Sequence, residues 1–454
     1  MIAMLAMTAA CNDVSVEWVS STYESPWQVM TVSSGTDSEK VIEIDTGKTL
    51  HEIEGFGTCF NELGWASLSD LTPEERNGIL NELFTPAGAN FTLARMPIAA
   101  NDFSLDYYSY APVAEDFELK SFSVAHDEDY LIPFIKAAQE INPDLKIWAS
   151  PWCPPSWMKV NRHYANAASC GNGLAEDKQI PEGVDAFILD ERYLDCYARY
   201  FGMFIDAYRT YGIDIHMVMP QNEPNSDQCY PACTWTPFGL AQFIKHLGPE
   251  MDKRDVEVYL GTMERADPEL WEYILKDPEA SRYIKGLGFQ WAGKDALPVL
   301  HERYPDLPCY QTEQECGDGQ NDWNGTMHSW DLMLHYLKNG VQGYLYWNTS
   351  LHEGGISTWG WRQNSLVVVN KEDKTFRYTP EYYLMKHFSH YVLPGAKVLD
   401  LGTEQDVIAF VNPDGSVIVN VVNRGDEQSV AIKVDGRSAE VTLPAGSINT
   451  FRFM

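Results

Sequence analysis

The sequence predicts an α/β fold, a (β/α)8 TIM barrel with an attached β-sandwich domain formed by N- and C-terminal strands. Between residues 51 and 385, short apolar runs rich in β-branched residues alternate with longer segments of helical periodicity. Both ends of the chain instead alternate apolar and polar residues, as half-buried strands do. The 454 residues are 44% hydrophobic, which is enough material for one large core and one smaller core.

Strand followed by helix, repeated eight times, is the pattern of a (β/α)8 barrel. The alternative is an open doubly wound sheet, which requires a glycine-rich phosphate turn after its first strand. The segment EGFGTCFNE (54–62) does not match that turn, because it leads into acidic and apolar residues. The eight strands are predicted at 54–58, 90–97, 146–151, 215–220, 257–263, 286–291, 308–312 and 341–347.

Helices are predicted where apolar residues recur at helical spacing between these strands. In the first, Thr72 is a candidate N-cap and Glu75 occupies the capping-box position. The clearest helical segments are 72–84, 126–141, 191–212, 236–251 and 330–340.

The chain ends predict a second domain. Residues 13–50 and 386–454 alternate in the manner of strands, and NPDG at 412–415 is a typical hairpin turn. Strands from the two segments are expected to build one β-sandwich beside a barrel of residues 51–385.

The first residues, MIAMLAMTAACND, resemble the end of a secretory signal and are too short to span a bilayer. The ending TAAC also resembles a bacterial lipoprotein signal, in which Cys11 is lipidated after cleavage. We therefore expect residues 1–12 to be a leader and the chain to be exported, as a periplasmic or cell-surface lipoprotein of a bacterium.

Composition excludes some functions. A net charge of −32 without a Lys/Arg-rich run argues against binding to nucleic acid or to an anionic membrane surface. The nine cysteines have no zinc-ligand spacing and give no disulfide connectivity. Cys229 and Cys233 are close enough for a local disulfide, and two free buried thiols are an equal alternative. No metal or cofactor is expected.

Polar and aromatic residues are concentrated where the predicted strands end, which is where barrel enzymes place their active sites. Two of them are glutamates, Glu223 after the fourth strand and Glu313 after the seventh. One carboxyl group that protonates a leaving oxygen and one that attacks the anomeric carbon form the pair used in sugar cleavage, and tryptophan faces suit sugar rings. The other candidates are Arg95, as a supporting residue, and, as residues that bind the substrate, Asp102, Trp152, Asn222, Gln290, Trp291 and Trp347.

The order of motifs from about residue 52 to 370 resembles glycoside hydrolase family 30, which includes glucosylceramidases and β-1,6-glucanases. The motifs are EGFG, RMPIAANDFS, IWASPWCPPSWMK, MPQNEP, YQTEQECG and YWNTSLHEGGISTWGW. The resemblance implies a barrel with a β-sandwich built from both termini, and hydrolysis of β-glycosides with retention of configuration.

The resemblance also implies residue roles. Glu223 corresponds to the acid/base and Glu313 to the nucleophile, while Asn222 would hold the 2-hydroxyl group of the sugar. Asp102 and Trp152 would bind hydroxyls of the terminal sugar above Trp347. Arg95 is expected to pair with a catalytic carboxylate. Around Trp291, glucosylceramidases carry His and Tyr where this chain has Gln290 and Ala292.

Glu315, two residues beyond Glu313, is expected in the following loop as a solvated or supporting carboxylate. The segment EPNSDQCYPACTW (223–235) is expected to shape the aglycone side. The favoured substrate is β-1,6-linked glucan, and glucosylceramide or another β-glucoside is the alternative. An alternative of another class is a catalytically inactive surface protein that binds glycans.

Overall fold

The computed structural model describes residues 16–32, 38, 40–169 and 171–454. The predicted leader and Cys11 lie outside the described residues. The chain divides into two compact units, one formed by residues 51–394 and the other by residues 1–50 with 395–454.

The larger unit is a closed barrel of eight parallel strands, as predicted. Each strand pairs with the next along the chain, and β12 pairs with β5 to close the ring. The side chains are buried on both faces of most strands, which explains their continuous apolar runs. The barrel strands are β5 (Gly55–Cys59), β6 (Leu93–Pro97), β7 (Lys146–Ser150), β8 (Ile215–Val218), β9 (Glu257–Met263), β10 (Ile284–Gln290), β11 (Cys309–Glu313) and β12 (Val341–Tyr346).

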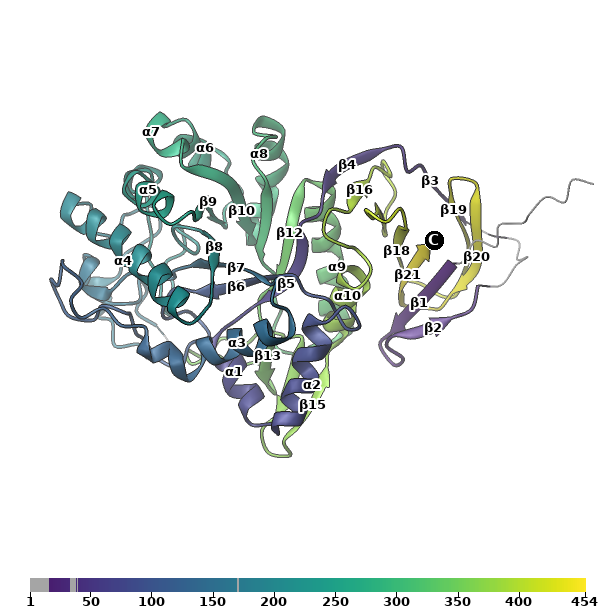
Figure 1. Ribbon diagram of the computed structural model, residues 1–454, viewed down its shortest axis with the longest axis horizontal. Helices are drawn as coiled ribbons and strands as arrows, with labels where there is room; N and C mark the ends of the chain where they lie inside the picture. The colour runs from purple at the N-terminus through teal and green to yellow at the C-terminus, as the bar shows by residue number, and fades with distance from the viewer. Residues whose placement is uncertain (1–15, 33–37, 39, 170) are drawn as a thin grey trace, which may run out of the picture. The chain divides into compact units, whose positions relative to one another are not determined.

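Helices lie outside the ring of strands (Figure 1). The capping box predicted at Thr72 and Glu75 is present at the start of α2, where Pro73 occupies the first turn. The helices are α1 (Glu62–Ser69), α2 (Pro73–Phe84), α3 (Leu131–Ile141), α4 (Glu191–Thr210), α5 (Pro237–Asp252), α6 (Glu269–Leu275), α7 (Pro278–Ser281), α8 (Leu297–Arg303), α9 (Trp323–Lys338) and α10 (Pro380–Ser389). Short 3-10 turns are η1 (Ala125–Asp129), η2 (Ser156–Met158), η3 (Glu176–Lys178) and η4 (Trp291–Asp295).

Two boundaries differ from the prediction. Helix α9 begins at Trp323, before the predicted 330, because the Asp322 side chain caps it by accepting a hydrogen bond from the Gly325 amide. The predicted domain boundary at 385/386 is wrong, because it falls inside α10, whose Phe388 packs against Phe56 of β5. The barrel unit therefore continues to Pro394.

A small sheet follows the last barrel strand within the same unit. It contains β13 (Ser350–His352), β14 (Val367–Asn370) and β15 (Thr375–Tyr378), and was not predicted.

The second unit is a β-sandwich built from both ends of the chain, as predicted. A seven-stranded sheet has the order β2-β1-β21-β18-β17-β16-β4, and a three-stranded sheet has the order β20-β19-β3. N-terminal β1 lies between β2 and β21, and Trp18 stacks on Phe451 with ring centroids 5.4 Å apart. Both sheets contribute to one apolar core. The strands are β1 (Val16–Thr22), β2 (Gln28–Met30), β3 (Lys40–Ile44), β4 (Thr49–Glu52), β16 (Lys397–Leu399), β17 (Val407–Val411), β18 (Val417–Asn423), β19 (Gln428–Val434), β20 (Arg437–Leu443) and β21 (Ser447–Phe453).

The NPDG segment forms the predicted hairpin between β17 and β18. The Gly415 amide donates to the Asn412 carbonyl at 2.9 Å, and Gly415 has a φ of +83°, a conformation that favours glycine.

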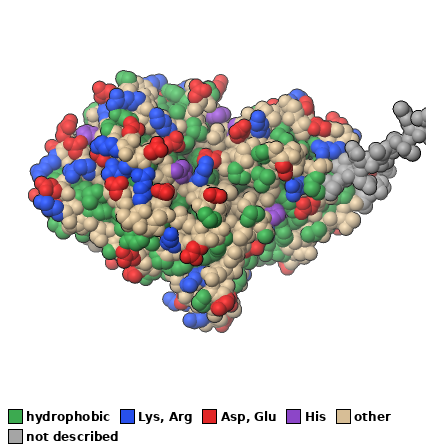
Figure 2. All heavy atoms as spheres, viewed as in Figure 1, with side chains coloured by type: hydrophobic (Ala, Val, Ile, Leu, Met, Phe, Trp, Pro, Cys, Tyr) green, Lys and Arg blue, Asp and Glu red, His purple; other side chains and the backbone are tan. Residues whose placement is uncertain are grey.

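Cys229 is disulfide-bonded, whereas Cys233 is a free buried thiol, so the two do not form the local bridge that their spacing allowed. Among the described residues, no helix is long and apolar enough to cross a membrane. On the face seen in Figure 2, basic side chains are interspersed with acidic ones.

Candidate active site

All the predicted site residues except Arg95 lie at or beyond the C-terminal ends of barrel strands. Gln290 and Glu313 are the last residues of β10 and β11, and Arg95 lies inside β6. Each of the others follows a strand: Asp102 follows β6, Trp152 β7, Asn222 and Glu223 β8, Trp291 β10 and Trp347 β12. The parallel strands thus bring residues more than 200 positions apart to one end of the barrel.

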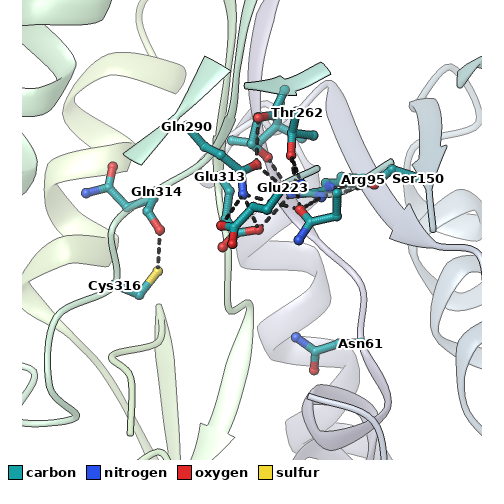
Figure 3. A network of polar contacts seen from close by, with 12 residues as sticks. Asn61, Arg95, Ser150, Glu223, Thr262, Gln290, Glu313, Gln314 and Cys316 are labelled. Atoms are coloured by element: carbon teal, nitrogen blue, oxygen red, sulfur yellow. Dashed lines mark hydrogen bonds and ion pairs between the residues drawn. The ribbon is translucent and has the colours of Figure 1, made fainter. Parts of the chain in front are cut away.

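Glu223 and Glu313 face each other across the side chain of Gln290 (Figure 3). The Gln290 Nε2 atom lies 2.8 Å from Glu223 Oε1 and 3.4 Å from Glu313 Oε2. The two carboxylate oxygens are therefore no farther apart than the sum of these distances. That limit is shorter than the separation of about 6.5 Å at which inverting glycosidases begin.

Arg95 is completely buried and binds one of the two carboxylates directly. Its Nη1 lies 2.9 Å from Glu313 Oε2, and its Nη2 donates to Asn222 Oδ1 at 2.7 Å. Ser150 Oγ accepts from the same guanidinium group at 3.0 Å. A buried guanidinium held by several acceptors orients the Glu313 carboxylate and supplies its counter-charge.

Burial raises the pKa of Glu223, and Gln290, Ser226 and Arg95 oppose that shift. Burial also raises the pKa of Glu313, against the opposing effect of Arg95. The charge of Glu223 also raises the pKa of Glu313, so a negative charge on one carboxyl opposes a negative charge on the other. Because Arg95 contacts Glu313 and not Glu223, we place the negative charge on Glu313 and the proton on Glu223.

Tryptophans surround Arg95. The guanidinium carbon lies 4.5 Å from the Trp152 ring centroid, 5.0 Å from that of Trp148 and 5.3 Å from that of Trp347. Trp152 also stacks on Trp347, with centroids 5.1 Å apart. These contacts fix the Trp152 ring and hold the cation by attraction to the aromatic faces.

A pocket of about 400 Å³ opens over the two glutamates. Of the predicted residues, Asp102, Trp152, Asn222 and Trp291 line it together with both glutamates. Gln290 and Trp347 do not line it: Gln290 lies between the carboxylates, and Trp347 lies behind Trp152 with no exposed surface.

One polar group in the pocket is available to a ligand, and a second is held in a fixed orientation. Asp102 Oδ1 is buried and has no hydrogen-bond partner among the described residues. Burial, with a contribution from Glu223, raises the pKa of Asp102 to about 7. Asn222 Oδ1 accepts from Arg95, Thr262 and Gln290, which fixes the orientation of the amide.

The comparisons with known proteins agree with this geometry. The model of the glycosyl hydrolase family 30 TIM-barrel domain matches residues 53–392, and that of the family 30 beta sandwich domain matches residues 395–451. The chain belongs to glycoside hydrolase family 30. It is therefore a glycoside hydrolase, and the family expected from the motifs is confirmed.

Relatives in family 30 carry different names. "Putative glucosylceramidase 1" of Caenorhabditis elegans is 29% identical over 90% of this chain and 82% of the relative. "Endo-1,6-beta-D-glucanase neg1" of Aspergillus fumigatus is 27% identical over 92% of this chain and 88% of the relative. The solved structure of "the endo-beta1,6-glucanase BT3312" has the same fold, with a TM-score of 0.81 and 24% identity over 96% of this chain and 99% of that one.

Several lining residues of this family 30 pocket were not predicted. Glu264 and Arg265 directly follow β9, so the same strand-end rule could have found them. Ser226, Gln228 and Tyr230 come from the segment expected to shape the aglycone side, and Trp361 comes from the last motif.

Glu315 also lines the pocket, and it is less solvated than expected. Its carboxylate accepts from Lys294 at 2.8 Å and contacts His328 at 3.0 Å. These two hydrogen bonds outweigh burial and lower the pKa of Glu315, so it is an ionised group held in a local network.

One group of possible metal ligands occurs among the described residues, and it is not in this pocket. Glu191, Asp195 and His246 lie close together on α4 and α5, where His246 already pairs with Asp195 at 2.7 Å. This cluster has no part in the chemistry of the two glutamates.

Proposed function

We propose that this pocket hydrolyses β-glucosidic bonds by double displacement, with Glu313 as nucleophile and Glu223 as acid/base. The observation that carries the proposal is the contact of one amide nitrogen, Gln290 Nε2, with both carboxylates. This contact limits the distance between the two oxygens to less than the range of inverting enzymes, which need space for a water, and it suits direct attack by one carboxylate.

The charges support these two roles. Glu313, paired with Arg95, attacks the anomeric carbon while Glu223 gives its proton to the leaving oxygen. Formation of the glycosyl-enzyme ester removes the negative charge of Glu313. The pKa of Glu223 then falls, and Glu223 takes a proton from the water that releases the sugar.

We assign sugar binding to the residues that line the pocket. Asp102 accepts from sugar hydroxyls through its unpartnered Oδ1, and Asn222 holds the 2-hydroxyl. Trp152 and Trp291 offer faces to the sugar. Gln290 and Trp347 do not line the pocket and act through other residues. Gln290 joins the carboxylates, and Trp347 supports Trp152.

The proposed substrate is β-1,6-linked glucan. Endo-1,6-β-glucanases occur both among the curated relatives and among the similar solved structures. Glucosylceramidases among the relatives make a glucosylceramide-type substrate the second candidate. Pocket residues Tyr230 and Trp361, whose ring centroids lie 6.4 Å apart, provide aromatic surface for a second sugar or another aglycone.

The test is hydrolysis of a panel of β-1,6-glucan, β-1,3-glucan, glucosylceramide and aryl β-glucosides. The proposal predicts the highest kcat/KM on β-1,6-glucan. A preference for glucosylceramide favours the second candidate. Glycan binding without turnover of any member, unchanged in Glu313→Gln, would support an inactive binding protein.

We also propose that the chain is exported and lipidated at Cys11. Residues 1–12 have the apolar and small residues of a lipoprotein leader. Metabolic labelling with a fatty acid tests this proposal, since Cys11→Ser is expected to lose the label and to leave the membrane fraction. Equal labelling of both proteins would contradict it.

A further inference from the structure

The short turn that carries Glu223 has an unusual backbone. Glu223 has a φ of +47°, in the left-handed region that non-glycine residues seldom adopt. The Ser226 amide donates to the Glu223 carbonyl at 3.1 Å, which closes a four-residue turn. Such a conformation is strained and persists only where neighbouring groups hold it.

The two residues that follow β9 bind this turn from both sides. Glu264 Oε1 accepts from the Asn225 backbone amide at 2.6 Å, and Ser226 Oγ lies 3.5 Å from the same oxygen. Arg265 Nη2 donates to the Asn225 carbonyl at 3.1 Å. Glu264 and Arg265, which follow β9, therefore bind both the amide and the carbonyl of Asn225.

This arrangement is buried and tied to the surrounding structure. Glu264 is only 1% exposed, and its Oε2 lies 3.4 Å from the Asn225 side-chain amide. Arg265 is fixed in turn by two hydrogen bonds to Glu182, at 2.9 and 3.1 Å. The Glu223 amide itself donates to Thr262 Oγ1 of β9 at 3.0 Å. The end of β9 thus determines where the Glu223 carboxyl points.

We infer that Glu264, assisted by Arg265, is a positioning residue that holds the proton of Glu223 at the leaving-group oxygen. The inference rests on the proposed role of Glu223 as acid/base. Without the acceptor at Glu264, the Asn225 amide is orphaned and the left-handed turn loses its support. The Glu223 carboxyl then moves from its place, while Glu313 and Arg95, which belong to other strands, stay in position.

If only Glu223 is displaced, the loss of kcat/KM should depend on the leaving group. Protonation matters for a poor leaving group such as phenol and hardly at all for 2,4-dinitrophenol, which departs as a stable anion. In Glu264→Leu, we expect kcat/KM to fall about 100-fold on phenyl β-glucoside and no more than about threefold on 2,4-dinitrophenyl β-glucoside. Glu264→Gln retains an acceptor oxygen and is expected to recover most of the activity on the phenyl glucoside.

Glu381 provides the matched control. It is as buried as Glu264, at 1% exposure, and accepts from Ser329 and Asn364 rather than from the turn. Glu381→Leu removes a carboxyl of equal burial, so its effect on kcat/KM should be the same factor for every leaving group. Arg265→Met loosens the same turn from its carbonyl side and should repeat the selective loss, even if Glu264→Leu does not fold.

The outcomes separate the inference from the proposed function. A wild-type protein that hydrolyses the whole series, with equal losses for all leaving groups in both Glu264→Leu and Arg265→Met, overturns the inference alone. A wild-type protein that hydrolyses neither these glucosides nor β-1,6-glucan overturns the proposed function, and the inference with it. A selective loss on poor leaving groups, recovered in Glu264→Gln, supports both.

Discussion

Arg95 and Glu313 form an ion pair in the interior of the barrel, with 2.9 Å between Nη1 and Oε2. Loss of the guanidinium leaves an unpaired buried carboxylate, so Arg95→Met should destabilise the protein by about 3–5 kcal/mol. The pKa of Glu313 should also rise, which moves the acid limb of the kcat/KM profile to higher pH. Arg95→Lys keeps the charge and should move the limb less. A folded Arg95→Met protein with an unshifted acid limb would contradict this assignment.

Gln290 joins the two carboxylates, and its removal should affect catalysis more than folding. Gln290→Leu removes a hydrogen bond to each of the two carboxyl groups, which we expect to lower kcat/KM by about 10- to 100-fold. Gln311→Leu is the control, because Gln311 is equally buried on neighbouring β11 and, within the described part of the chain, its side chain binds only the Leu345 amide. Steady-state kinetics of both variants checks the difference. Equal losses would mean that the bridge has no catalytic effect.

Asp127 does not line the pocket, but it makes the stability of the folded protein depend on pH. Its carboxylate accepts from Tyr108, Tyr110 and Tyr208, and burial raises its pKa to about 6. In the unfolded chain the pKa is roughly 3.9, so the folded state binds this proton more tightly. The resulting stability is fully present below about pH 4 and is lost as the pH rises through about 6.

Asp127→Asn lacks this titration. The free energy of unfolding of the variant, relative to that of wild type, should therefore increase from pH 4 to pH 7, by at most about 3 kcal/mol. Urea unfolding across this pH range measures the difference. A difference that is constant with pH would show that Asp127 does not titrate as described.

Lys159 ties together two segments of the chain near the pocket. It is completely buried, and its Nζ donates to the carbonyls of Tyr164, Ala165 and Ala232. Lys159→Met removes this donor from all three carbonyls, although those of Tyr164 and Ala165 keep a second donor, and should cost about 2–5 kcal/mol of stability. Lys178→Met, on an exposed 3-10 turn, should change stability by less than about 0.5 kcal/mol. Similar melting temperatures for the two variants would contradict the structural role of Lys159.

The barrel was predictable because its strands are buried on both faces and carry long apolar runs, as in β9 (Glu257–Met263), where the predicted and observed bounds coincide. Short helices such as α7 (Pro278–Ser281) were missed, since four residues give no periodic signal. The 385/386 boundary failed because the docking of α10 on β5 is a contact between segments far apart in sequence.

The proximity of the two glutamates was predictable for a related reason. Glu223 follows the end of β8 and Glu313 is the last residue of β11, and the barrel geometry brings strand ends together. Their connection through Gln290 was not predictable, because it depends on side-chain orientation, and Gln290 was expected to bind sugar. The proposed role of Glu264 was not predictable either, because its contact with the Asn225 amide joins the segments that follow two different strands, β8 and β9.

The stereochemistry of the first product tests the central claim most directly. Proton NMR of an aryl β-glucoside mixed with a high concentration of enzyme resolves the anomers of the released glucose before they equilibrate. Two successive displacements at carbon 1, by Glu313 and then by water, predict that the β-anomer appears first. Initial release of the α-anomer would contradict the account.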